Sequence, residues 1–227
     1  MKHYALLLSI LITVPIIAHH KSEEFEVPLT EDLMREHGIL NRILLIYEEV
    51  IYRIDHNQDF PADALLKAVD IIKTFIEEHH EHMEERYLFP LFEHNNQEVA
   101  LVKTLKIQHT KGREITDTVQ QLLSNPLTLE AKQAIRNSLK NFITMYRPHE
   151  AREDTVIFPK IREFLSDEEF DELGETFELL EHELLGENGF ENIVQTVEDI
   201  EKALDIYVLE QFTPKFTRCL ALSSYKK

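Results

Sequence analysis

The sequence is poor in the residues that build disulfides, thiolate clusters and turn-rich sheets. Its 227 residues include one cysteine, five glycines, eight prolines and no tryptophan. A single cysteine, Cys219, excludes an intramolecular disulfide and any thiolate cluster. A bound metal would therefore take its ligands from imidazole, carboxylate and water, which favours iron, manganese or zinc over copper(I) or an iron–sulfur cluster. The few glycines and prolines disfavour a turn-rich all-β protein.

Positive charge is also scarce. The chain has 42 acidic against 24 basic residues, a formal net charge of −18, and no cluster of lysine and arginine. Nucleic acid is therefore not an expected partner. The composition is 43% hydrophobic and 29% charged, which allows a buried core and argues against a disordered chain. The length suffices for one sizeable domain with an extension.

No apolar run reaches the roughly 20 residues that a membrane-spanning helix needs. The nearest is residues 5–18, which follow Lys2 and are interrupted by Pro15. We interpret residues 1–18 as a signal peptide cleaved after Ala18, which would leave a secreted or periplasmic protein without a stable transmembrane span. An uncleaved membrane anchor and a buried N-terminal helix, in a membrane-anchored or cytoplasmic protein, are the alternatives.

Apolar residues recur at alternating spacings of three and four, the period of an amphipathic helix. Four such stripes follow one another, and the first, from Glu31, includes His37 among its apolar residues. The third includes His109, and the fourth runs through His149 and Glu153 to Val156. Short connections between the four predict an all-α protein, an up-down-up-down four-helix bundle over residues 29–165.

The remaining residues, 167–227, are interpreted as an additional C-terminal helical extension that packs on the bundle. Ser166 followed by three acidic residues predicts a capped helix start. Residues 186–192 predict a turn, and a further amphipathic helix is expected from about Phe190 to Leu204.

One motif occurs twice: His, three residues, Glu, four residues, Phe-Pro. The copies span residues 80–90 and 149–159, and each follows a stripe histidine by 43 or 40 residues. Residues four apart share one helix face, so His80 with Glu84, and His149 with Glu153, can each bind metal from one side. Proline loses a helical hydrogen bond, so each Phe-Pro predicts a helix end or kink.

The stripe histidines of the first and third helices complete a set of four imidazoles and two carboxylates. Its members are His37, His80, Glu84, His109, His149 and Glu153. A lone stripe histidine is more often a packed core residue, so the prediction rests on the duplication and on the cost of burying Glu153 unpaired. A site for two metal ions, bridged by carboxylates, is therefore predicted. A metal-free polar network is the structural alternative.

The other histidines lack this pattern. His79 and His82 have no glutamate four residues on, and His82 points about 200° away from His80 around the helix. His79 is either a hydrogen-bond partner of the site or an alternative ligand. His94 is expected beyond the helix break, and His182 at the surface or in packing contacts.

The six residues and both Phe-Pro endings resemble the hemerythrin-like (HHE cation-binding) family over about residues 29–165. The resemblance implies a non-haem di-iron centre in a four-helix bundle, with manganese or zinc as alternatives to iron. It also implies that Glu84 and Glu153 bridge the two ions. The four imidazoles, two for each ion, would come from His37, His80, His109 and His149.

Two positions depart from the oxygen-carrying hemerythrins. These proteins have a further histidine one turn after that of the third helix, where this chain has Arg113, and an aspartate five residues after the last histidine, where Glu153 follows at four. The pattern is closer to six-ligand members associated with iron sensing, nitrosative-stress repair or reactions with oxygen species. The missing imidazole would leave coordination positions for water, O₂, NO or peroxide.

We therefore expect a protein that binds or senses O₂ or NO, or that handles iron. A di-iron oxidoreductase, namely a peroxidase, an oxidase or a nitrosative-stress repair factor, is the alternative. Arg113 is interpreted as a surface residue bonded to a carboxylate, or else as a charge beside the open coordination site. Tyr146, on the stripe, is interpreted as a packed core residue rather than a donor to bound oxygen.

Overall fold

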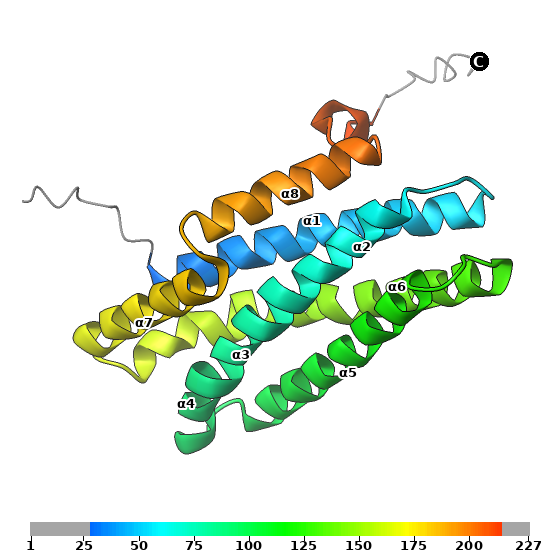
Figure 1. Cartoon of the computed structure of the whole chain (residues 1–227). Coiled ribbons are helices and arrows are strands. Elements are labelled where there is room, and N and C mark those ends of the chain that lie inside the picture. Colours follow the sequence, from blue (N-terminus) through cyan, green and yellow to red (C-terminus); the bar gives the residue numbers. More distant parts are fainter. Residues whose placement is uncertain (1–27, 215–227) are drawn as a thin grey trace, which may run out of the picture.

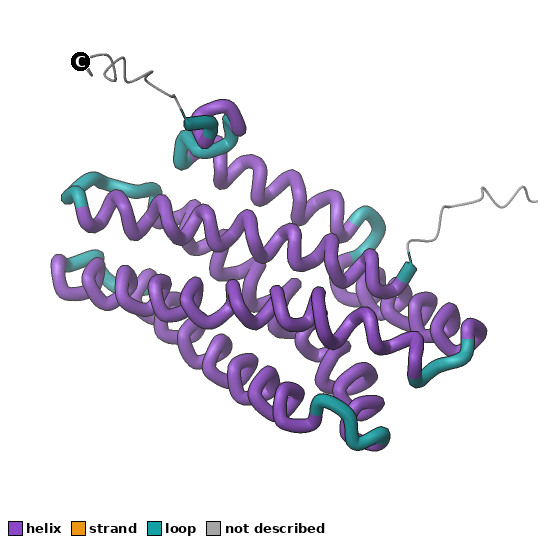
Figure 2. Tube along the Cα trace, turned by 180° about the vertical axis from the view of Figure 1, so that it is seen from behind, coloured by secondary structure: helices purple, strands orange, loops and turns teal. Residues whose placement is uncertain are grey.

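The computed structural model describes residues 28–214, which contain helices and loops but no strand (Figures 1 and 2). Four antiparallel helical rods form a bundle, as predicted. The first and third rods are single helices, α1 (Leu29–Asp55) and α5 (Val99–Leu123). The second is a run of five segments, α2 (Ala62–Ile71), η1 (Ile72–His80), α3 (Glu81–Met83), η2 (Glu84–Leu88) and α4 (Phe89–His94). The fourth consists of α6 (Leu129–Arg152), η3 (Glu153–Ile157) and η4 (Phe158–Glu163).

The Phe-Pro sequences change the helix type but do not end the helices. A π-helical segment precedes each of them, and the chain continues helically through Pro90 in α4 and Pro159 in η4. A wider turn accommodates a proline, which has no N–H to donate and would clash with an α-helical carbonyl one turn back. His94 therefore follows the Phe-Pro, as expected, but the break before it is a change of helix type rather than a helix end, and His94 lies exposed at the end of α4.

The π turn of the fourth rod also shifts the core stripe by one residue. A regular spacing predicts Val156 in the core, but Val156 is half-buried, while Ile157 is fully buried. One extra residue in the turn rotates everything after it by about 100° around the helix axis. Phe158 is thereby brought into the core as well.

The interior consists of two apolar clusters separated by a polar level. On α1, Leu33 belongs to one cluster and Leu40 to the other, with His37 between them. On the second rod, Ile76 and Leu88 are divided in the same way. The six predicted ligand positions, three on each pair of consecutive rods, therefore fall at one height, enclosed by apolar side chains above and below.

The C-terminal extension forms two helices and a short turn: α7 (Asp167–Leu185), α8 (Gly189–Ala203) and η5 (Leu209–Phe212). Ser166 and Glu169 form a reciprocal capping box at the predicted start of α7. α8 lies alongside α1 and α2, and α7 packs against α1 and η1 (Figure 1). A two-pronged contact fixes α8, because Arg42 donates to Glu201 at 2.9 and 2.6 Å.

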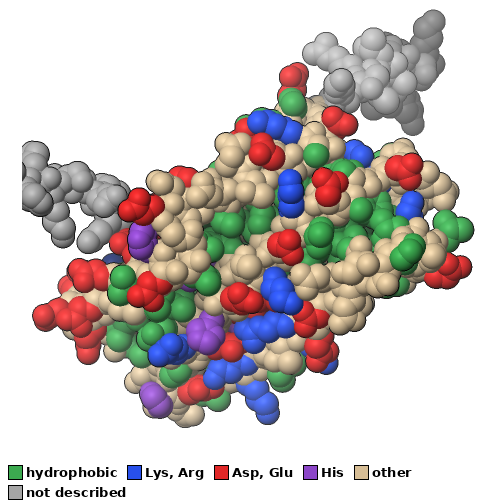
Figure 3. Space-filling view, viewed as in Figure 1, with side chains coloured by type: hydrophobic (Ala, Val, Ile, Leu, Met, Phe, Trp, Pro, Cys, Tyr) green, Lys and Arg blue, Asp and Glu red, His purple; other side chains and the backbone are tan. Residues whose placement is uncertain are grey.

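Acidic side chains gather over α7 in the space-filling view (Figure 3), in keeping with its sequence. Within residues 28–214 none of the helices has both the length and the apolar character needed to cross a membrane. The predicted signal peptide, residues 1–18, and the end of the predicted extension, residues 215–227, lie outside the described residues.

Candidate metal centre

All four rods contribute to one buried cluster of histidines and glutamates. Two groups, in each of which the potential ligand atoms lie within 4.8 Å of one another, contain all six predicted residues. One group is His37, His80 and Glu153, and the other is Glu84, His109, His149 and Glu153. None of the six is more than 3% exposed. Because Glu153 belongs to both groups, the cluster has the form of two adjoining sites.

The two glutamates lie between the imidazoles. Glu153 Oε1 is 3.0 Å from His149 Nε2, and Glu153 Oε2 is 3.5 Å from His37 Nε2. Glu84 Oε2 is 3.4 Å from His109 Nε2 and 3.8 Å from His80 Nε2. Each carboxylate thus reaches one imidazole from each group, as expected of a bridging ligand.

Hydrogen bonds at the far nitrogens fix the orientation of the stripe histidines. His37 Nδ1 donates to Asp154 Oδ1 at 2.8 Å, and His109 Nδ1 donates to Glu85 Oε1 at 2.9 Å. Carboxylates only accept, so in the neutral imidazole the ring proton lies on Nδ1 and the lone pair is on Nε2. Both lone pairs face the cluster.

The motif histidines are held in the same way. His80 Nδ1 donates to Glu36 Oε2 at 2.5 Å, and His149 Nδ1 donates to Gln108 Oε1 at 2.9 Å. All four Nε2 atoms therefore point inward as lone-pair donors, and those of His109 and His149 approach to 3.1 Å without a proton to share. Metal-bound imidazoles have this arrangement.

These four partners are absent from the sequence prediction, although each is next to a predicted ligand. Glu85 and Asp154 directly follow the motif glutamates, while Glu36 and Gln108 directly precede the stripe histidines. Both halves of the bundle have a side chain that can accept a hydrogen bond just before the stripe histidine and just after the motif glutamate. This repetition is the sequence signal that could have identified the four partners.

The buried carboxylates have no hydrogen-bond donors of their own. Both oxygens of Glu84 and of Glu153 lack a hydrogen bond, as does His80 Nε2. The imidazole nitrogens nearest to them carry lone pairs, so the short distances between them are unfavourable without a cation. A positive ion among these atoms satisfies both types of group at once. The six residues therefore fit a metal.

The titration behaviour of the cluster indicates the same need for positive charge. Burial raises the pKa of Glu84 well above its usual range, and the charge of Glu153 raises it further. Burial lowers the pKa of His109 to about 4, so this imidazole is neutral, which is the form that binds metal. Burial lowers the pKa of His37, but the hydrogen bond to Asp154 and the charge of nearby Glu153 outweigh it and raise the pKa to about 10. Without metal, His37 therefore takes a second proton on Nε2, and a bound cation would take the place of that proton.

The phenylalanine of each Phe-Pro covers the cluster. Phe89 stacks on His109 at 5.7 Å between ring centroids, and Phe158 stacks on His37 at 5.4 Å, each at an angle of 23°. Both phenylalanines are fully buried. The end of each half therefore shields the stripe histidine of the other half from water.

Arg113 and Tyr146 flank one side of the cluster. Arg113 Nη2 lies 2.8 Å from Glu81 Oε2 and 2.9 Å from Glu85 Oε1, with about a third of the side chain exposed. Arg113 is bonded to carboxylates as expected, but they come from the second rod rather than its own helix. The Tyr146 hydroxyl donates to Glu81 Oε1 at 2.5 Å, so Tyr146 is both packed and hydrogen-bonded. Burial raises the pKa of Glu81 to about 8.

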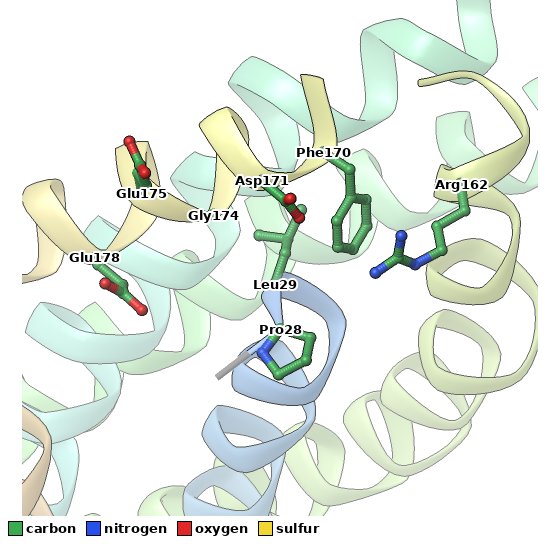
Figure 4. Close-up of a pocket in the computed structure, with 8 residues that line it drawn as sticks. All are labelled: Pro28, Leu29, Arg162, Phe170, Asp171, Gly174, Glu175 and Glu178. Carbon is green, nitrogen blue, oxygen red and sulfur yellow. The ribbon is translucent and has the colours of Figure 1, made fainter. Parts of the chain in front are cut away.

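The four other histidines weighed above, His79, His82, His94 and His182, lie outside the two groups. His79 lies 3.1 Å from Glu36 and belongs to neither group. His82, His94 and His182 are exposed. A pocket of about 160 Å³ between the start of α1 and α7 (Figure 4) has eight lining residues, none of them among the six.

The fold and the cluster define a class of protein: a four-helix bundle with buried histidine and glutamate groups able to hold metal. Residues 29–161 match the model of one family of this class, the hemerythrin HHE cation binding domain. The chain belongs to this family.

Three relatives are each 46% identical to the chain over 195 residues, which cover 84% of this chain and 76% of each relative. They are the uncharacterized proteins Mb2018 of Mycobacterium bovis, and MT2051 and Rv1995 of two strains of Mycobacterium tuberculosis. An aligned share of 84% exceeds what residues 1–161 could supply, so the similarity continues into the extension. No solved structure matches the chain at a significant level.

Proposed function

We propose that the protein holds a pair of non-haem iron ions in this cluster and binds or senses O₂ or NO, or handles iron. The observation that carries the proposal is the orientation of the four imidazoles. Each donates from Nδ1 to an acceptor and turns the lone pair of Nε2 towards two carboxylates that have no other partner. Imidazole with carboxylate is a ligand set suited to iron.

The six residues divide naturally between two ions. His37 and His80 would bind one ion, His109 and His149 the other, and Glu84 and Glu153 would lie between them. Manganese or zinc suits the same ligands. The assignment follows the two groups of ligand atoms and the distances from each glutamate to imidazoles of both groups.

When bound, an iron pair supplies exchangeable coordination positions and one-electron redox chemistry towards small molecules such as O₂, NO or peroxide. The surrounding side chains determine access to it. Phe89 and Phe158 exclude water, and Glu36 and Asp154 hold two imidazoles in one tautomer. Arg113 stands where oxygen-carrying hemerythrins have a further ligand, and its charge is paired with Glu85 at 2.9 Å and lies 2.8 Å from Glu81.

A metal-free structural bundle is a poorer explanation of the same atoms. In it, Glu84 would be fully buried with neither oxygen hydrogen-bonded, at a cost of several kcal/mol of folding free energy. A metal-free bundle with an apolar side chain in place of Glu84 would be more stable.

The proposal is tested by loading the full chain anaerobically with Fe(II) and titrating it with O₂ and with NO while recording optical spectra. We expect iron to bind and each gas to change the spectrum. The double variant Glu84→Gln/Glu153→Gln is expected to lose the response, and the exposed substitution Glu78→Gln to keep it. Absence of bound iron and of any spectral change in the unmodified protein would contradict the proposal.

A second candidate function, a di-iron oxidoreductase, is favoured by the side chains next to His149. Tyr146 lies 5.2 Å from the His149 ring and donates to Glu81, a buried carboxyl whose raised pKa lets it hold a proton near neutral pH. Steady-state consumption of peroxide or NO decides this. Rates no higher than those of the His80→Ala/His149→Ala double variant would eliminate it.

A further inference from the structure

A second group of potential ligands lies outside the centre, where α7 meets α1 and η1. It consists of Glu36, His79 and Glu181, whose ligand atoms all lie within 4.8 Å of one another. Glu36 is 2% exposed and His79 is 3% exposed, while Glu181, on α7, is half-buried. Three elements distant in sequence therefore bring one imidazole and two carboxylates together.

The two oxygens of Glu36 serve different partners. Oε2 accepts from His80 Nδ1 at 2.5 Å, and Oε1 lies 3.1 Å from His79 Nε2. The latter distance is close to the roughly 3.0–3.4 Å between neighbouring ligand atoms around an ion at about 2.1 Å. One oxygen thus supports the centre, and the other faces a separate imidazole.

The other half of the bundle shows that an acceptor can hold a motif histidine without also contacting a second imidazole. Gln108 occupies the position that matches Glu36, and its neutral amide holds His149 as Glu36 holds His80. The residue before His149 is Pro148, where the first half has His79. The charge of Glu36 and the imidazole of His79 therefore occur together only where α7 covers the bundle.

The group carries an excess of negative charge. Asp32 lies one turn before Glu36 on α1, and burial together with the charge of Glu36 raises the pKa of Asp32 to about 6. Burial, Glu36 and Asp32 likewise raise the pKa of Glu181 to about 7. Arg35, 3.1 Å from Asp32, offsets this in part, and Glu178 of α7 adds to it. A divalent cation would neutralise such a group.

We propose that Glu36, His79 and Glu181 bind a further, mononuclear divalent cation, separate from the pair in the centre. One imidazole with two carboxylates suits a first-row ion such as Mn(II), Fe(II) or Zn(II), with water completing its coordination. The ion joins α7 to the bundle, and through Glu36 it adjoins the hydrogen bond that holds His80. The site does not require that the centre contain iron.

Cobalt(II) is a suitable probe, because its optical spectrum reports ligand geometry and its binding can be counted by equilibrium dialysis of the full chain. The test variant is Glu181→Gln, which keeps shape and removes one ligand on the half-exposed face of α7. The matched control is Glu183→Gln, two residues on and exposed. Both are made in the unmodified chain and in the Glu84→Gln/Glu153→Gln background.

We expect Glu181→Gln to lose one equivalent of cobalt, or to weaken its binding by about tenfold or more, in both backgrounds. Glu183→Gln should bind as its parent does. One equivalent of cobalt should remain bound to the Glu84→Gln/Glu153→Gln variant and should be lost when Glu181→Gln is added to it. Loss of metal binding at the centre is thereby distinguished from loss of metal binding at this site. Identical cobalt titrations for Glu181→Gln and Glu183→Gln in both backgrounds would overturn the proposal.

Discussion

At the scale of single residues, one contact, with Tyr146, explains why residue 112 is a glycine. A Cβ added there would overlap the Tyr146 hydroxyl, whereas one added at Gly38, also within a helix, meets nothing within 4 Å. We expect Gly112→Ala to lower the free energy of unfolding by roughly 1–3 kcal/mol, because Tyr146 must move and its bond to Glu81 is strained. Gly38→Ala should raise it by about 0.5–1 kcal/mol. Denaturant unfolding measures both, and equal stability of the two variants would contradict the contact.

Glu77 provides a pH-dependent prediction. Burial raises its pKa from 4.5 to about 7, so between these values the folded protein keeps a proton that the unfolded chain has released. The stabilising contribution is present below about pH 4.5 and is lost as pH rises through about 7. In metal-free protein, Glu77→Gln should remove about 2 kcal/mol of the decline in stability between pH 5 and 8. Unfolding free energies across this range measure the effect.

The exposed substitution Glu78→Gln is the matched control for Glu77→Gln. It should leave the pH profile of the unmodified protein unchanged. A profile for Glu77→Gln as steep as that of this control would show that Glu77 does not hold its proton in the folded state.

The sequence was sufficient to place the six cluster residues but not their partners. Helical periodicity identifies which residues face the core, and a charged or imidazole group there is conspicuous. Glu36 and Gln108 lie at the edge of that face, where burial depends on the crossing of α1 and α5 with their neighbours. The sequence does not single out Glu81 for the same reason, although Glu81 is 1% exposed and accepts a hydrogen bond from Tyr146.

At the scale of elements, the π turn of η3 decides which residue enters the core. Ile157 is fully buried and Val156 is only half-buried, the reverse of what an unbroken α-helix predicts. We expect Ile157→Ala to cost about 2–4 kcal/mol of unfolding free energy. Val156→Ala should cost less than about 1 kcal/mol. Thermal or denaturant unfolding compares them, and a larger cost at Val156 would place the core stripe in the α-helical register.

The sequence could not reveal these π turns. The same residues suit an α-helix. The π turn forms only if accommodating the proline and burying Phe158 stabilise the folded chain by more than the loss of one regular α-helical turn destabilises it. Helix starts were more predictable, because capping at Ser166 is a local interaction of adjacent residues. The turn before α8 is shorter than expected, since α8 begins at Gly189.

At the scale of the whole molecule, the centre ties all four rods together, so metal should stabilise the folded chain. An ion that binds the folded state and not the unfolded one raises the melting temperature. We expect verified removal of metal with a chelator to lower the melting temperature by at least about 5 °C, measured by calorimetry. The Glu84→Gln/Glu153→Gln variant should show a much smaller decrease. An unchanged melting temperature after metal removal would argue against a shared structural role.

The bundle was predictable from sequence because four stripes with short connections leave few arrangements. The way α7 and α8 cover it was not, because it rests on contacts between residues far apart, such as Arg42 with Glu201. The group of Glu36, His79 and Glu181 arises from that covering, which explains why the sequence could not decide between the two roles expected of His79.

The most direct test of the centre is the iron content of the full chain after anaerobic loading and gel filtration, with Mössbauer spectra of the bound iron. We expect the unmodified protein to retain about two more irons per chain than Glu84→Gln/Glu153→Gln, with the spectrum of a magnetically coupled pair. Equal iron contents in the two proteins, or only magnetically isolated irons, would contradict a di-iron centre in this bundle.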